Sequence, residues 1–284
     1  MIWKTGNRKH EVGERTYIMG IVNVTPDSFS DGGNFLNLDA AVEQGRKLAE
    51  EGADILDIGG ESTRPGARPV SLDEEIRRVV PVLKQLRESL PDILLSVDTS
   101  KAGVAGEALH AGADIINDVT AGRGDSEMFP LAAQSGAGLV LMHMQGRPEN
   151  MQTEPRYQHV VREVYGFLGE RMQQALEKGV MPEQICLDPG IGFGKTLQHN
   201  LDLIAGLDRL KDFHRPLLLG VSRKRWLGEI TERDVDGRLA ASLGGAAACV
   251  GRGANILRVH DVIESCDLVK ILDRVNQAQS THSL

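Results

Sequence analysis

The chain has 284 residues, of which 41% are hydrophobic and 25% are charged, and its formal net charge is −8. This composition is typical of a globular protein in water, and the length is normal for a single α/β barrel. Acidic residues outnumber basic ones by 40 to 32, so the chain lacks the basic excess of a general nucleic-acid binder, and no nucleic-acid partner is expected.

The cysteines and the N-terminal residues bear on where the protein works. Cys186, Cys249 and Cys266 stand far apart, without zinc-site spacing, and are expected to be buried thiols in a reducing compartment. Residues 1–10 contain no apolar signal-peptide core, and the most apolar helical stretch, 239–250, is too short to cross a bilayer. We therefore expect a cytoplasmic protein without a membrane partner.

Short apolar runs alternate with longer amphipathic segments along the chain. The short runs predict strands at 17–22, 55–58, 94–97, 115–116, 138–142, 185–187, 217–219 and 256–259. The longer segments predict helices at 39–51, 72–90, 101–111, 127–134, 159–178, 200–210, 237–250 and 262–277. Ser71 and Glu74 form a capping box at the start of the second helix, and Pro81 is expected to kink or divide that helix.

Eight strand–helix pairs without a strand-rich block indicate parallel βαβ units. At this length, the count of eight favours a closed (β/α)8 TIM barrel over an open doubly wound sheet. No linker divides the chain, so residues 1–284 are predicted to form a single domain with short tails at 1–15 and 279–284.

The first predicted strand ends in a polar segment punctuated by proline and glycine. Residues 23–33 carry an amide, Asn23, two carboxylates, Asp27 and Asp31, and one aromatic ring, Phe29. A strand that ends in such a loop can fix the first polar residue while the loop remains free to close. A merely solvated connection is the alternative.

The other predicted strands also end in polar or glycine-rich residues. The carboxyl ends of the strands of a barrel share one rim, so these residues are predicted to converge there. The polar exits after Asn23 lie at 59–66, 98–100, 117–118, 142–144, 188–195, 220–224 and 258–261.

Three of these residues, Asp98, Asn117 and Asp188, offer donors and acceptors that suit the edge of a flat, nitrogen-rich heterocycle. Asp98 could instead be the N-cap of the helix at 101–111. His143 is interpreted as a buried histidine at a strand end rather than as a ligand.

Arg258 and His260 are two residues apart on one strand and face the same side. With Asn23 on the neighbouring strand of a closed barrel they form a candidate anion pocket, in which Arg258 could bind a phosphate or diphosphate through two hydrogen bonds. Asn23 also suits Mg²⁺ that keeps most of its waters and is otherwise held by the phosphates of a substrate.

The segment 190–196 resembles two nucleotide-binding motifs and matches neither. A P-loop requires a glycine where Pro189 stands, and the dinucleotide fingerprint requires a glycine where Lys195 stands. We interpret this segment as a flexible loop that lets the backbone and Phe193 approach a ligand.

Taken together, these segments resemble the dihydropteroate synthase family, which joins a pterin to p-aminobenzoate in the folate pathway. The matching segments follow in the order of the family at 19–33, 59–66, 96–98, 117–119, 141–143, 188–195, 220–224 and 258–261. The resemblance implies a (β/α)8 barrel, a homodimer, and a transferase that condenses 6-hydroxymethyl-7,8-dihydropterin diphosphate with p-aminobenzoate to give 7,8-dihydropteroate and diphosphate.

The resemblance also implies a role for individual residues. Asn23 would bind Mg²⁺, while Arg258 and His260 would bind the diphosphate. Asp27 and Phe29 would belong to a mobile loop over the site and act in catalysis together with Asp98 and Lys224. The pterin would be held by Asp98, Asn117, Met142, Asp188, Gly220 and Lys224, and p-aminobenzoate by Thr63, Arg64, Pro65, Phe193 and Ser222.

The expected mechanism is an SN1-like substitution, in which diphosphate leaves first and Asp98 stabilises the pterin methylene cation. Two rivals remain: a pterin-binding domain that transfers a methyl group to a corrinoid, and a catalytically idle pterin-binding paralogue. Arg225 departs from the serine of some family members, and its side chain could face either p-aminobenzoate or solvent.

Overall fold

The computed structural model of the chain describes residues 1–24, 34–62, 66–67 and 69–282. Its main element is an eight-stranded parallel sheet with the strand order β8-β7-β6-β5-β4-β3-β10-β9. The sheet curls into a barrel, because β8 meets β9 through a parallel bridge between Leu187 and Leu217. The strands are β3 (Tyr17–Asn23), β4 (Ile55–Gly59), β5 (Leu94–Asp98), β6 (Ile115–Asp118), β7 (Gly138–Met142), β8 (Ile185–Asp188), β9 (Leu218–Leu219) and β10 (Ile256–Val259).

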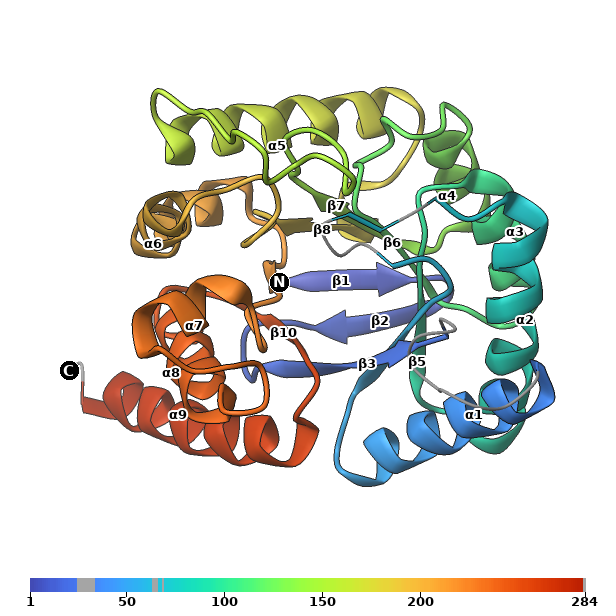
Figure 1. Ribbon diagram of the computed structural model, residues 1–284, viewed down its shortest axis with the longest axis horizontal. Helices are drawn as coiled ribbons and strands as arrows, with labels where there is room; N and C mark the ends of the chain where they lie inside the picture. The colour runs from blue at the N-terminus through green and yellow to red at the C-terminus, as the bar shows by residue number, and fades with distance from the viewer. Residues whose placement is uncertain (25–33, 63–65, 68, 283–284) are drawn as a thin grey trace.

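Helices connect successive strands and form an outer ring around the sheet (Figure 1). The expected (β/α)8 TIM barrel is therefore confirmed. The helices are α1 (Asn34–Glu50), α2 (Leu72–Ser89), α3 (Ala102–His110), α4 (Met128–Ser135), α5 (Val160–Glu177), α6 (Leu197–Ala205), α7 (Arg225–Thr231), α8 (Leu239–Val250) and α9 (Val262–His282), with 3-10 turns at Pro182–Gln184 and Leu207–Phe213. None of the described helices is long and apolar enough to cross a membrane.

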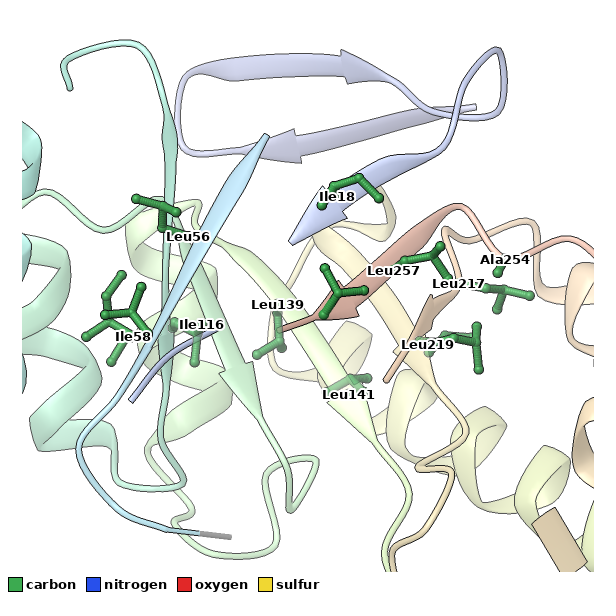
Figure 2. Close-up of a cluster of buried hydrophobic side chains, with 14 of the residues drawn as sticks. Ile18, Leu56, Ile58, Ile116, Leu139, Leu141, Leu217, Leu219, Ala254 and Leu257 are labelled. Atoms are coloured by element: carbon green, nitrogen blue, oxygen red, sulfur yellow. The ribbon is translucent and has the colours of Figure 1, made fainter. Parts of the chain in front are cut away.

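The pleat of the strands divides their side chains between two cores. Residues such as Leu56, Ile58 and Ile116 are fully buried and pack outward, toward the helices. Figure 2 shows ten labelled side chains of this outer core, most of them on the strands. The residues between them point to the barrel interior, since successive side chains of a strand alternate between its faces.

The interior core contains one apolar residue from each strand of the barrel. These eight side chains pack against one another in the N-terminal half of the barrel and leave no space there for a ligand. They are Met19, Ile55, Leu94, Ile115, Val140, Cys186, Leu218 and Ile256.

An antiparallel hairpin closes the N-terminal end of the barrel. Strands β1 (Ile2–Thr5) and β2 (Arg8–Glu11) form it, and Figure 1 shows it across the centre of the barrel. Trp3 is fully buried in the interior core, and its indole N–H donates to the carbonyl of Gln184 at 2.9 Å. The prediction of a tail at 1–15 does not hold for these strands, because Trp3, together with the buried Thr5 and Val12, secures a segment that is otherwise mostly polar.

Some predicted boundaries also differ. Helix α1 begins at Asn34 rather than at 39, α7 was not predicted, and α9 continues to His282, into the predicted C-terminal tail. Helix α2 continues through Pro81 without a break. The Ser71 hydroxyl accepts from the Glu74 amide at 3.3 Å, so Ser71 caps the helix. The Glu74 carboxylate accepts from Arg78 instead of from the Ser71 amide, so the predicted capping box is only half formed.

Candidate active site

A layer of mostly polar side chains lies two residues further along the strands than the interior apolar core, toward the C-terminal end of the barrel. Asp57 is two residues after Ile55, and Arg258 is two residues after Ile256. Side chains two apart on a strand share a face, so these groups point into the barrel at its C-terminal end. Ser96, Asn117, Met142, Asp188 and Gly220 follow the apolar residues of their strands in the same way.

Asp57 is the hub of this polar layer, and its carboxylate is fully buried. One oxygen accepts from the Ser96 hydroxyl at 2.6 Å, and the other accepts from Asn117 Nδ2 at 3.0 Å and Arg258 Nε at 2.6 Å. Asp57 was not predicted, since it lies inside a strand rather than at its exit. A lone carboxylate in the apolar run Ile55–Gly59 was the available signal.

Arg258 bridges two carboxylates. Its Nη2 donates to Asp98 Oδ2 at 2.9 Å while its Nε donates to Asp57. The alternative role of Asp98 as a helix cap is wrong, because the first amide of α3, that of Ala102, donates to Asp125 Oδ2 instead. Asp98 therefore faces the barrel mouth.

Burial shifts the pKa values of the two rim carboxyls upward. The pKa of Asp98 rises to about 7, against the opposing effect of the Arg258 guanidinium. The pKa of Asp188 rises to about 6, although the Gly190 amide donates to its Oδ1 at 2.7 Å. Both groups thus change charge near neutral pH.

Lys224 and a group of methionines also line the polar layer at the C-terminal end of the barrel. Burial and the nearby Arg258 lower the pKa of Lys224 to about 8, and its Nζ lies 4.1 Å from the centroid of the Phe193 ring. Met142 is buried in a small cluster that also contains Val119, Met144 and Met151, with Phe193 packed against it. These side chains form an apolar wall beside the charged groups.

His260, the second member of the candidate anion pocket, is neutral. Its Nδ1 lies 3.0 Å from the Ser222 hydroxyl, and burial and Arg258 lower its pKa to about 4. The imidazole is therefore neutral near pH 7 and can act as a hydrogen-bond donor rather than as a charge. Gly220 leaves space beside Arg258, since a Cβ there would lie 3.9 Å from Arg258 Cβ.

Asn23 ends β3 and pairs in register with Gly59. Its half-buried amide has no hydrogen-bond partner within the described part of the chain. The described residues also contain no cluster of three or more His, Cys, Asp or Glu side chains that could hold a metal. A single neutral oxygen fits a Mg²⁺ ion whose other ligands come from water and substrate, and does not fit a permanently bound ion.

Five predicted site residues fall outside the described residues: Asp27, Phe29, Thr63, Arg64 and Pro65. The flanks of both segments lie at the C-terminal rim. The Val24 amide donates to the Gly59 carbonyl at 2.8 Å, and the Gly66 amide donates to the Pro148 carbonyl at 3.2 Å.

His143, which was predicted to be no ligand, and Arg225, whose direction the sequence left open, both lie outside the polar layer. His143 is buried, its ring packs edge-on against Phe167, and burial lowers its pKa to about 2, which confirms its interpretation as a buried histidine. Arg225 is largely exposed and its Nε donates to Glu229 at 2.9 Å, so it faces solvent.

Comparison with known proteins agrees with this geometry. Residues 19–260 match the model of a family described as pterin binding enzyme. A dihydropteroate synthase of Synechocystis sp. is 45% identical over 271 residues, which cover 94% of this chain and 93% of that protein. The chain belongs to the dihydropteroate synthase family.

Solved dihydropteroate synthases share the fold over their whole length. The Xanthomonas albilineans enzyme, solved with 4-aminobenzoic acid, has a TM-score of 0.90 and 44% identity, with 97% of this chain and 99% of that chain covered. The Yersinia pestis enzyme, solved in a sulfonamide drug complex, has a TM-score of 0.91 and 42% identity, with 98% and 100% covered. Membership confirms the expected activity, a transferase reaction of folate biosynthesis that forms dihydropteroate.

Proposed function

We propose that the polar layer described above joins 6-hydroxymethyl-7,8-dihydropterin diphosphate to p-aminobenzoate and releases diphosphate. The observation that carries this proposal is the set of free acceptor atoms at the barrel mouth. Among the described residues, Asp98, Asn117 and Asp188 each use one side-chain polar atom internally and keep one oxygen without a donor. Three such oxygens suit the N–H groups on the edge of a pterin.

The remaining contacts to the pterin complete this pocket. Lys224 would donate to an acceptor of the ring system, and Met142 would pack against its flat face with a polarisable thioether. Gly220 would leave room for the ring beside Arg258. Phe193, Ser222 and the predicted residues Thr63, Arg64 and Pro65 would hold p-aminobenzoate.

The diphosphate would leave across the β3–β10 seam. Asn23 would hold Mg²⁺, which when bound neutralises part of the charge of the leaving group. Arg258 would donate through Nη1, which no described residue occupies, and neutral His260 would donate one N–H. These contacts would make diphosphate a competent leaving group.

We propose an SN1-like reaction without a covalent enzyme intermediate. The bond from the pterin methylene carbon to the diphosphate oxygen breaks, and the bonding electron pair leaves with the diphosphate. The ionised Asp98 carboxylate stabilises the resulting cation, and the neutral amine of p-aminobenzoate then attacks the methylene carbon. The new C–N bond leaves the nitrogen positively charged, and its extra proton passes to the released diphosphate or to solvent. Asp27 and Phe29 are proposed to cover the site and exclude water, the competing nucleophile.

The decisive experiment measures diphosphate release after mixing the chain with each substrate alone and with both together. Release that requires both substrates and accompanies the appearance of dihydropteroate supports the proposal.

Asp98→Asn should reduce turnover by roughly 100-fold while the KM for p-aminobenzoate changes little. Unchanged turnover in this variant would remove Asp98 from the mechanism. No release from the wild-type chain would favour an idle paralogue or a corrinoid methyltransferase domain, which a methyl-transfer assay would separate.

Two further properties are proposed on narrower grounds. We place the enzyme in the cytoplasm, since its three cysteines are free and buried, as expected of a protein from a reducing compartment. We also propose a homodimer, because exposed apolar side chains recur on the neighbouring helices α7, α8 and α9.

A further inference from the structure

The glycine-rich segment after β8 is wound tightly against the segment after β7. Gly190, Gly192 and Gly194 have φ angles of +68°, +84° and +60°, a region that favours glycine. A Cβ at Gly190 would lie 1.8 Å from the His143 carbonyl oxygen, and one at Gly194 would lie 2.5 Å from the Gln145 carbonyl oxygen. The backbones therefore approach too closely for any side chain at these positions.

A buried lysine lies between the segment 190–194 and the segment after β7. The side chain of Lys195 is only 3% exposed, and its Nζ lies 2.8 Å from the Gly190 carbonyl oxygen, 2.9 Å from the Phe193 carbonyl oxygen and 2.9 Å from His143 Nδ1. Together with the more distant His143 carbonyl oxygen, at 3.4 Å, these acceptors take up the three donors of an ammonium group, which requires the His143 ring to carry its proton on Nε2. Asp188 is the carboxylate that attracts it electrostatically, without a direct hydrogen bond, and burial lowers the pKa of Lys195 to about 7 against this attraction. Burying an unpaired ammonium group is costly, so such a residue needs a compensating role.

The atoms held by Lys195 belong to the segment that supports the substrate pocket. The carbonyl of Phe193 is one of its acceptors, and the ring of Phe193 lies 4.1 Å from Lys224 Nζ. Gly190 is another acceptor, and its amide donates to Asp188 Oδ1 at 2.7 Å. One ammonium group thus fixes the backbone beneath two predicted contacts of the substrates.

We infer that Lys195 is a positioning residue, which holds Phe193 against Lys224 and thereby sets the p-aminobenzoate side of the pocket without touching either substrate. This inference rests on the proposed function. A purely structural lysine would affect stability alone. A positioning lysine must also affect the reaction, and it must do so through Phe193.

A double-mutant cycle tests this coupling. Lys195→Met keeps the length of the side chain and removes the ammonium group, and Phe193→Leu removes the ring. We expect Lys195→Met to raise the KM for p-aminobenzoate roughly tenfold in the wild-type background and less than about twofold in the Phe193→Leu background. Fully multiplicative effects of the two changes, or wild-type kinetics in Lys195→Met, would overturn the inference.

A matched control separates positioning from stability. Gln184 is also fully buried and its amide donates to the carbonyls of Ala132 and Ala137, at 2.9 and 2.7 Å, at the opposite end of the barrel. Gln184→Met should lower the melting temperature and leave the KM for both substrates unchanged. If Lys195→Met does not fold, Lys195→Gln can replace it in the cycle, because its amide can still donate two hydrogen bonds.

Hydrogen exchange gives a readout that does not depend on turnover. The amides of residues 190–194 should exchange at least about tenfold faster in Lys195→Met than in the wild-type chain, while those of β3 should not change. Unchanged exchange would contradict the inference even if the wild-type chain released no diphosphate. If exchange is faster in Lys195→Met but the wild-type chain releases no diphosphate, the proposed function alone would be contradicted.

Discussion

Arg258 holds its positive charge between two carboxylates, of which the inner one, Asp57, is fully buried. Removing one partner of a buried ion pair leaves the other charge desolvated and uncompensated. Asp57 also accepts from Ser96 and Asn117, so it fixes the orientation of the side chains that are proposed to meet the pterin. Asp57 should therefore affect both stability and binding of the pterin, although it contacts no substrate in the proposed pocket.

Asp57→Asn, which preserves the shape of the side chain, tests this expectation. It should lower the free energy of unfolding by about 3 kcal/mol, because Arg258 loses one of its two carboxylates. The KM for the pterin diphosphate should rise at the same time. Urea denaturation and steady-state kinetics measure the two effects. Glu154→Gln, at the exposed pair with Arg156, is the control and should cost less than about 0.5 kcal/mol. An equally small effect at Asp57 would contradict its role as the hub.

The charge states of Asp98 and Lys224 predict how the reaction depends on pH. Since burial raises the pKa of Asp98 to about 7, its carboxylate is ionised above that pH. Since burial lowers the pKa of Lys224 to about 8, its ammonium group is protonated below that pH. We expect kcat/KM for the pterin diphosphate to be highest between these values and to fall on both sides. Stopped-time assays across this range check the profile. In Asp98→Asn the acidic limb should move from about pH 7 toward the pKa of Asp188, about 6; a limb that stays near pH 7 would assign it to another group.

At the scale of elements, the N-terminal hairpin is a closure of the barrel rather than an appendage. Its first strand contacts β7, β8 and the turn at Pro182–Gln184, far along the chain from it. Trp3 is the largest buried side chain of the hairpin and Thr5 is also fully buried, while Ile2, beside Trp3, is 39% exposed. Trp3 thus makes the main apolar contact of this element with the barrel.

Trp3→Ala should therefore lower the free energy of unfolding by about 3–5 kcal/mol, through lost burial and the cavity left behind. Ile2→Ala, on the other face of the same strand, should cost less than about 1 kcal/mol. Thermal and urea unfolding measure both. The KM for both substrates should stay constant in both variants, because the hairpin and the substrate pocket lie at opposite ends of the barrel. A KM that rises along with the loss of stability would show that the hairpin shapes the site.

Sequence periodicity predicted the barrel and its rim for a physical reason. Strands buried on both faces appear as short apolar runs, and the residues that follow them at the rim must be polar. Asp98, Asn117 and Asp188 were found in this way. Asp57 was not found, because it lies inside a strand. Its role becomes clear only when it is known which side chains of all eight strands point into the barrel. The hairpin was missed because its pattern is too short and too polar, and α7 because it has only seven residues.

At the scale of the whole molecule, stability and chemistry are divided along the barrel axis. The N-terminal half contains the eight interior apolar residues and the hairpin that covers them. The C-terminal half contains the buried charges, whose desolvation is unfavourable for folding. The apolar half can therefore offset the cost of burying these charges without sharing residues with them. Substitutions in the first half should act on unfolding alone, whereas substitutions in the second should act on the reaction, and also on unfolding where they break a buried ion pair, as at Asp57.

Exposed apolar residues on the outer surface are consistent with the proposed homodimer. Helices α7, α8 and α9 lie side by side on one flank of the barrel (Figure 1). Ile230 on α7 is 51% exposed, Leu239 on α8 is 37% exposed, and Ile271 on α9 is 67% exposed. Val275 lies four residues after Ile271, on the same helix face, and is 50% exposed. Apolar side chains that recur over adjacent helices are expected at an interface between subunits.

Sedimentation velocity should accordingly give about twice the chain mass of 30.9 kDa. Ile271→Glu would place a charge in this interface and should shift the protein toward the monomer, because a buried unpaired carboxylate opposes association. Met181→Glu alters another exposed apolar residue, at the N-terminal end of the barrel, and should leave the mass unchanged. A wild-type monomer at micromolar concentration would contradict the dimer itself. A dimer that persists in Ile271→Glu would place its interface elsewhere, since the flank of α7 to α9 could not then be buried between the subunits.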